Sequence, residues 1–177
     1  RPNYVFAYNN LASVKFNNFN VIDSSIDYLK TALSYDSNAP MLYLNLAIIQ
    51  NAKGSFTLAV KNATRAIVLN VEDKAGAYQS RGKAKRNLKQ YQEAIDDYSK
   101  AIELSPKDSS GYTNREQVYR SMGKIKEADA DFAKASKVGS AQLLLDITDR
   151  STTNAFMLQK TAVDTYRSNL PDIAKTI

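Results

Sequence analysis

The chain has 177 residues, 44 % of them hydrophobic, and carries a net charge of +6 from 24 basic and 18 acidic residues. This is enough apolar material for a continuous core, and no apolar run approaches the roughly 18 residues of a membrane span, so we expect no transmembrane segment. Histidine and cysteine are absent, which excludes disulfides, thiolate chemistry and the commonest general base and metal ligand.

A fixed spacing divides most of the chain into repeats. Small residues stand 34, 35 and 34 positions apart at Ala32, Ala66, Ala101 and Ala135. Three further series keep the same step and begin at Ile22, Ser25 and Leu29. Repetition at this period is typical of stacked helix pairs.

The period predicts four repeats over residues 1–142, at about 6–39, 40–74, 75–108 and 109–142. Within them we expect helices at 6–18, 22–35, 40–52, 56–69, 75–88, 91–104, 109–122 and 125–137. Segment 91–104 illustrates how these helices are predicted, because its apolar residues recur at helical spacing and fall on one face. Asp96 and Asp97 fall on the other face, which we expect to be solvated. Gly54 and Gly123 suit the turns within pairs, and Ser109 or Ser110 suits the cap of the fourth repeat.

The repeat pattern ends near Gly139. Segment 143–177 contains an amphipathic stretch at 155–168, and we expect helices here that cap the array, since the last apolar face of a solenoid must be covered. A docking surface for another protein is the alternative.

The third repeat carries Tyr78, Gly82, Ala94, Tyr98, Ala101 and Pro106 at fixed spacings. In these positions it resembles the sequence pattern of the tetratricopeptide-repeat family. Two positions depart from it, with Arg81 in place of the usual leucine and Lys85 in place of the usual tyrosine. The resemblance implies an all-α fold: a right-handed superhelical solenoid of four helix–turn–helix repeats, closed by a C-terminal helical cap.

No group of residues supports an enzyme. Glycine-rich phosphate-binding sequences are missing, and the acidic pairs Asp96–Asp97 and Asp129–Asp131 are flanked by lysines, as on solvated helix faces. We therefore expect no catalytic residue, no cofactor and no metal site.

The first helix of each pair lines the concave wall of such an array. The register places there a set rich in carboxamides, which can pair with both groups of a peptide backbone. The predicted peptide-binding residues are Asn10, Asn45, Asn51, Gln79, Lys83, Arg86, Asn114, Gln117 and Arg120. The resemblance assigns a backbone-binding role to Asn45 and Asn114. Solvated polar surface is an equally good explanation of this composition.

A basic cluster stands in the third repeat, and only Lys83 and Arg86 in it should reach the groove. It favours an acidic or C-terminal peptide over nucleic acid, because most tyrosines occupy packing positions rather than stacking surfaces. Co-chaperones of the family hold a chaperone tail with a carboxylate clamp. The clamp positions here hold Asn10, Val14, Asn45, Gly76 and Ser80. Only Asn45 fits, so chaperone-tail binding is disfavoured.

We therefore expect a non-catalytic protein-interaction scaffold that binds a peptide or protein segment in its concave groove, as a monomer or weak oligomer. Two alternatives stay open: an assembly module that oligomerises through its end face or C-terminal helix, and an accessory repeat domain of a larger protein. The chain begins at Arg1 rather than Met, so we expect it to be a fragment of a longer protein. Whether a signal, an anchor or further repeats precede it is left open. Its compartment is undetermined, and a cytoplasmic or a bacterial periplasmic setting both fit.

Overall fold

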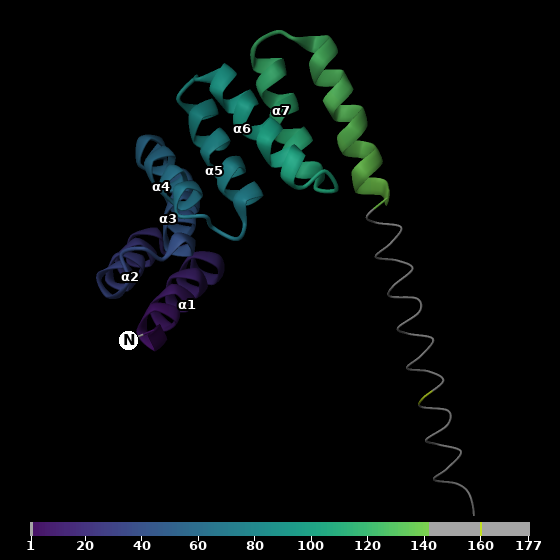
Figure 1. The fold of residues 1–177 in the computed structure, drawn as a ribbon. Coiled ribbons are helices and arrows are strands. Elements are labelled where there is room, and N and C mark those ends of the chain that lie inside the picture. Colours follow the sequence, from purple (N-terminus) through teal and green to yellow (C-terminus); the bar gives the residue numbers. More distant parts are fainter. Residues whose placement is uncertain (1, 142–159, 161–177) are drawn as a thin grey trace, which may run out of the picture. The chain divides into compact units, whose positions relative to one another are not determined.

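The computed structural model of the protein describes residues 2–141 and 160. The chain divides into two units, Arg1–Ser136 and Lys137–Ile177. Throughout the described residues the regular structure is helical and contains no strand (Figure 1). The first unit contains α1 (Pro2–Phe19), α2 (Ile22–Tyr35), α3 (Pro40–Lys53), α4 (Phe56–Val68), α5 (Lys74–Asn87), α6 (Tyr91–Leu104) and α7 (Ser109–Ser121). Residues 125–136 are also helical.

The helix boundaries follow the hydrophobic periodicity closely. Each of α2 to α7 begins and ends within one residue of its expected bounds. Helix α1 is longer than expected, since it begins at Pro2 rather than at residue 6. Proline is tolerated in the first turn of a helix because the amide hydrogen that it lacks has no intrahelical acceptor there.

The first helices of successive pairs lie against one another. In Figure 1, α1 pairs with α2, α3 with α4 and α5 with α6, each pair joined by a short turn. Helix α3 also contacts α1 and α5, and α5 contacts α7. Residues on α3, α5 and α7 can therefore line one common surface.

Small side chains occupy the crossings between helices, as the repeat register predicts. Ser25, Ala59, Ala94 and Ala128 are each completely buried. In the second series, Ala32, Ala66 and Ala101 are buried and Ala135 is half-buried. A small residue here lets two backbones approach closely, and a larger one would overpack the contact.

Gly82 is explained by its neighbour on the paired helix. A Cβ atom at this position would lie 2.9 Å from Cε1 of Tyr98. Tyr98 is completely buried on α6. The glycine of the family pattern therefore leaves room for the aromatic ring of the same repeat.

Two aspartates cap the first helices of the third and fourth repeats. The Asp73 carboxylate accepts a hydrogen bond from the Gly76 amide at 2.8 Å, at the start of α5. Asp108 accepts one from the Ser110 amide at 2.9 Å and so caps α7. Our assignment of this cap to Ser109 or Ser110 was wrong, because the cap residue stands just outside the helix and both serines lie inside it.

The turns within pairs use glycine where the backbone is left-handed. Gly54 follows α3 with φ of +81°, and Gly123 follows α7 with φ of +72°. Such values cost little for glycine because it has no Cβ. Both turns were placed correctly by the sequence.

The second unit is described only at residues 137–141 and 160, which are helical. The predicted capping segment 143–177 therefore lies, apart from residue 160, outside the described residues. Among the helices that the structure describes, none is long and apolar enough to cross a membrane.

Candidate functional site

A groove of about 510 Å³ runs across α3, α5 and α7. Six of the nine predicted binding residues line it: Asn51, Gln79, Lys83, Arg86, Asn114 and Gln117. Ile48, Gly76 and Ser80 complete the lining. The groove exists because the first helices of successive pairs stand side by side, so that equivalent positions of three repeats converge on one surface.

Of the other three predicted residues, two line hollows next to this groove. Arg120 lines an adjoining hollow that also contains Arg86 and Gln117. Asn45 lines a smaller hollow next to Ile48, which is shared with the main groove. Asn10 is exposed on α1 and lines none of these three depressions.

Two of the groove carboxamides are used within the protein. Asn51 is 7 % exposed. Its Nδ2 donates to the Ser80 carbonyl at 2.8 Å and also contacts Ser80 Oγ at 3.1 Å. Gln79 Nε2 donates to Asp108 Oδ2 at 2.8 Å, and Gln79 Oε1 accepts from Ser110 Oγ at 2.9 Å. These two residues therefore tie neighbouring repeats together. Both groups of the Gln79 amide are bonded, whereas Asn51 Oδ1 is buried without a hydrogen-bond partner among the described residues.

The remaining carboxamides differ in whether their side chains already form hydrogen bonds within the protein. Gln117 Oε1 accepts a hydrogen bond from Arg86 Nη1. Asn45 Nδ2 donates to Asn9 Oδ1 on α1 at 2.7 Å. Asn114 is half-buried in the groove and makes no side-chain hydrogen bond to any residue that the structure describes. Asn114 is thus the groove carboxamide with both its acceptor and its donors available.

The charged residues that line the groove are all basic. No acidic residue lines it, and neither Lys83 nor Arg86 forms an ion pair within residues 2–141. Arg120, in the adjoining hollow, instead pairs with Glu116 and with Asp129 at 3.2 Å. The hydrogen bond to Glu116 is the main cause of a raised pKa of Arg120. Only Lys83 and Arg86 therefore present uncompensated positive charge to the groove.

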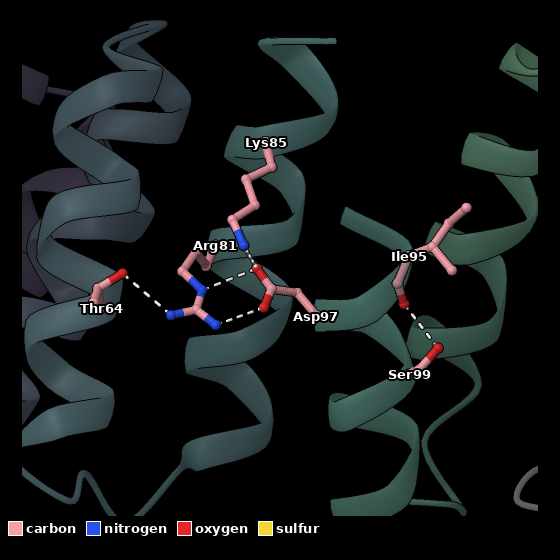
Figure 2. Close-up of polar contacts among 6 residues, drawn as sticks. All are labelled: Thr64, Arg81, Lys85, Ile95, Asp97 and Ser99. Carbon is pink, nitrogen blue, oxygen red and sulfur yellow. Dashed lines mark hydrogen bonds and ion pairs between the residues drawn. The ribbon is translucent and has the colours of Figure 1, made fainter. Parts of the chain in front are cut away.

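Two further basic residues on α5, Arg81 and Lys85, lie outside the groove lining and hold a buried carboxylate. Figure 2 shows Arg81 and Lys85 converging on Asp97 of α6, which is 3 % exposed. Lys85 Nζ lies 2.9 Å from Asp97 Oδ2, and Arg81 Nη1 reaches Thr64 Oγ1 on α4 at 3.2 Å. The expectation that Asp97 lies on a solvated face was wrong, because these partners neutralise it inside the helix pair.

The same arrangement recurs one repeat later. Arg115 binds Asp131 through Nε and Nη2, both at 2.8 Å, and its Nη1 donates to Ser99 Oγ at 2.8 Å. Ser99 Oγ in turn donates to the Ile95 carbonyl at 2.7 Å (Figure 2). Asp131 is 3 % exposed, so its assignment to a solvated face was also wrong. Asp96 and Asp129 are exposed, as expected.

The pKa shifts follow these pairings. The hydrogen bond to Asp97 raises the pKa of Arg81 despite burial, and Asp131 does the same for Arg115. Burial pushes the pKa of Asp108 upward, but hydrogen bonds from Ser110 and Gln79 outweigh it, and the net shift is downward.

Sequence reasoning missed the two arginine–aspartate pairs. The available signal was an arginine at a leucine position followed 16 residues later by an aspartate, in both later repeats.

The described residues form no metal centre. Across residues 2–141 and 160, no three acidic, histidine or cysteine side chains gather closely enough to hold a cation.

Comparisons with known proteins agree with this architecture. The family model described as tetratricopeptide repeat matches residues 75–108. No curated protein matches the chain in sequence. A crystal structure of MamA is 24 % identical over 81 % of this chain and 82 % of its own, with a TM-score of 0.71.

Two structures of RPAP3 have the same fold. The first tetratricopeptide repeat domain of Spaghetti (RPAP3), bound to the HSP90 peptide SRMEEVD, is 22 % identical over 70 % of this chain and 96 % of its own, with a TM-score of 0.65. The first such domain of human RPAP3 is also 22 % identical, over 72 % of this chain and 99 % of its own, with a TM-score of 0.65. These likenesses show that the chain has the helical-repeat fold of these proteins.

Proposed function

We propose that this tetratricopeptide-repeat protein is a non-catalytic scaffold that binds an extended peptide or protein segment in the groove of α3, α5 and α7. The observation that carries the proposal is the convergence of six residues, selected by register alone, on one concave surface with two unpaired cations. The RPAP3 domain with a bound HSP90 peptide supports the proposal, because a chain of this fold holds a peptide there.

The groove is built for polar recognition. Asn114 provides one acceptor and two donors, enough to pair with both the carbonyl and the amide of a peptide backbone. The hydrogen bonds of Asn51 and Gln79 to the neighbouring repeat fix the walls before any ligand arrives. Pre-organised walls reduce the conformational entropy that binding would otherwise cost.

A peptide array probed with the parent protein and its variants tests the proposal. Asn114→Ala should weaken all ligands alike, by about 1 kcal/mol for a lost neutral hydrogen bond. Asn45→Ala should have a smaller effect, because Asn45 is already bonded to Asn9. Lys83→Glu/Arg86→Glu should remove most ligands, whereas the matched control Lys61→Glu/Lys107→Glu, at exposed positions outside the groove, should retain them. Equal recovery of partners by all these proteins would rule out this groove as the binding site.

A second candidate function is self-assembly through the end of the first unit. Ile125 is 51 % exposed and Phe132 60 % exposed, although the repeat register places both at packing positions. Among the described residues these side chains form an apolar end face, which a second copy of the chain can cover. Sedimentation equilibrium of the parent and of Phe132→Ser separates the two functions. A dimer that Phe132→Ser dissociates would favour assembly, and a monomeric parent favours the peptide-binding scaffold.

A further inference from the structure

We infer that the groove selects a segment in which a carboxylate stands close to an apolar side chain, with the carboxylate at Lys83 and Arg86 and the apolar group at Ile48. This inference rests on the proposed function, because it assigns a ligand chemistry to the same groove.

The first argument is the charge balance. On α5, Arg81 and Lys85 both pair with Asp97 outside the groove lining, whereas Lys83 and Arg86 lie in a lining without any acidic residue. Two like charges in one groove repel each other, and a bound anion relieves that repulsion. The arginine side chain has a planar fork suited to a carboxylate, and the bond from Arg86 Nη1 to Gln117 orients that fork.

The second argument is the position of the apolar surface. Ile48 is 42 % exposed on α3. It lines the main groove together with Lys83 and also lines the neighbouring hollow together with Phe16 and Ile49. Apolar contact is therefore available on the α3 side and positive charge on the α5 side. A ligand that uses both must carry an apolar group and an anionic group within a short distance.

Phosphate is the other anion that two cations could attract. Single-stranded nucleic acids are usually held by cations together with aromatic rings on which the bases stack. The lining of the main groove contains no aromatic side chain. The groove chemistry thus favours a carboxylate on a peptide, which requires only the two cations, Ile48 and the free carboxamide of Asn114.

The test uses short fluorescein-labelled peptides that carry a leucine followed, at varied spacing, by a pair of glutamates. Fluorescence anisotropy measures their affinity for the parent protein. Replacement of the glutamates by glutamines should weaken binding about tenfold, as expected for losing a close charge pair. Lys83→Glu/Arg86→Glu should lose the acidic peptides and gain the matching lysine peptides, and Lys61→Glu/Lys107→Glu should do neither. Peptides with a free or an amidated C-terminus decide whether a terminal or a side-chain carboxylate is preferred.

The apolar half is tested separately. Ile48→Ser should abolish the preference for leucine over serine in the peptide while leaving the preference for glutamate over glutamine intact. Lys83→Gln/Arg86→Gln replaces the double charge reversal if thermal unfolding shows that the reversed variant is not folded.

The outcomes separate the inference from the proposed function. If glutamine peptides bind as well as glutamate peptides while Asn114→Ala still weakens both, the groove binds peptides and the inference is wrong. If no peptide binds, the proposed function fails too. If single-stranded oligouridylate binds in place of the peptides and Lys83→Glu/Arg86→Glu removes it, the groove takes phosphates and both are overturned.

Discussion

The Arg81 guanidinium binds the Asp97 carboxylate through two parallel hydrogen bonds, from Nε to Oδ2 at 2.9 Å and from Nη2 to Oδ1 at 2.6 Å. The second repeat has a neutral counterpart. Leu46, Gln50 and Asn62 stand 35 positions before Arg81, Lys85 and Asp97. There Asn62 Nδ2 donates to Gln50 Oε1 at 2.8 Å. The same site between paired helices is therefore filled by an amide pair in one repeat and by an ion pair in the next.

Removing the carboxylate should destabilise the protein strongly. Asp97→Ala leaves Arg81 and Lys85 facing each other without a counter-charge, and we expect a loss of about 3 kcal/mol in the free energy of unfolding. Chemical denaturation measures this loss. Asp96→Ala, at the exposed neighbouring position, is the control and should change stability by about 0.5 kcal/mol or less.

Replacing the whole ionic site by its neutral counterpart should be tolerated far better than breaking it. The variant Arg81→Leu/Lys85→Gln/Asp97→Asn recreates the residues of the second repeat, so no buried charge is left unpaired. We expect it to unfold at denaturant concentrations much closer to the parent than to Asp97→Ala. If it is as unstable as Asp97→Ala, the two repeats do not pack equivalently.

Gly82→Ala should cost about 1–3 kcal/mol, because the added methyl group would overlap the Tyr98 ring. Gly139→Ala is a matched control in a helical segment, since a Cβ there meets no described residue within 4 Å. Thermal unfolding of both variants measures the difference. Equal melting temperatures would show that the ring of Tyr98 can move aside.

Tyr98→Phe should stabilise the protein most at high pH. Burial raises the pKa of Tyr98 to about 12 in the folded protein, although the nearby charge of Arg86 opposes the shift. A raised pKa means that the stabilisation is complete below the ordinary value of 10 and is lost as the pH rises toward 12. Tyr98 Oη is buried with no hydrogen-bond partner among the described residues. At neutral pH the phenylalanine variant should therefore be at least as stable as the parent, because it loses no hydrogen bond, and its advantage should grow by about 2 kcal/mol as the pH rises from 10 to 12.

Asp108 should contribute stability that depends on pH in the opposite direction. Its pKa is lowered in the folded protein, so its contribution is present above the ordinary carboxyl pKa and is lost as the pH falls through the folded value. Asp108→Ala removes the cap of α7 and should cost about 1 kcal/mol at neutral pH. Denaturation at several pH values should show this difference shrinking below about pH 4. A difference that stays constant down to pH 2 would contradict the role of the ionised carboxylate.

The sequence alone determined the helices and their register. Helix formation depends on local spacing, and a step of 34 or 35 residues repeats the same packing positions, so the buried Ala59 and Ala94 could be placed without coordinates. The register also selected the groove residues, because equivalent positions of stacked pairs fall on one surface.

Only the tertiary structure decided which polar groups are free. Asp97 looked solvated because its helix neighbours are charged, but its partner Arg81 lies on another helix, 16 residues away in sequence. Asn51 and Gln79 looked available for a ligand, yet each is bonded to a neighbouring repeat. These pairings depend on distances between helices, which no periodicity within one helix encodes. The groove therefore retains Lys83 and Arg86 without an ion-pair partner and Asn114 without a side-chain hydrogen bond among the described residues, whereas Asn51 and Gln79 hold one repeat against the next.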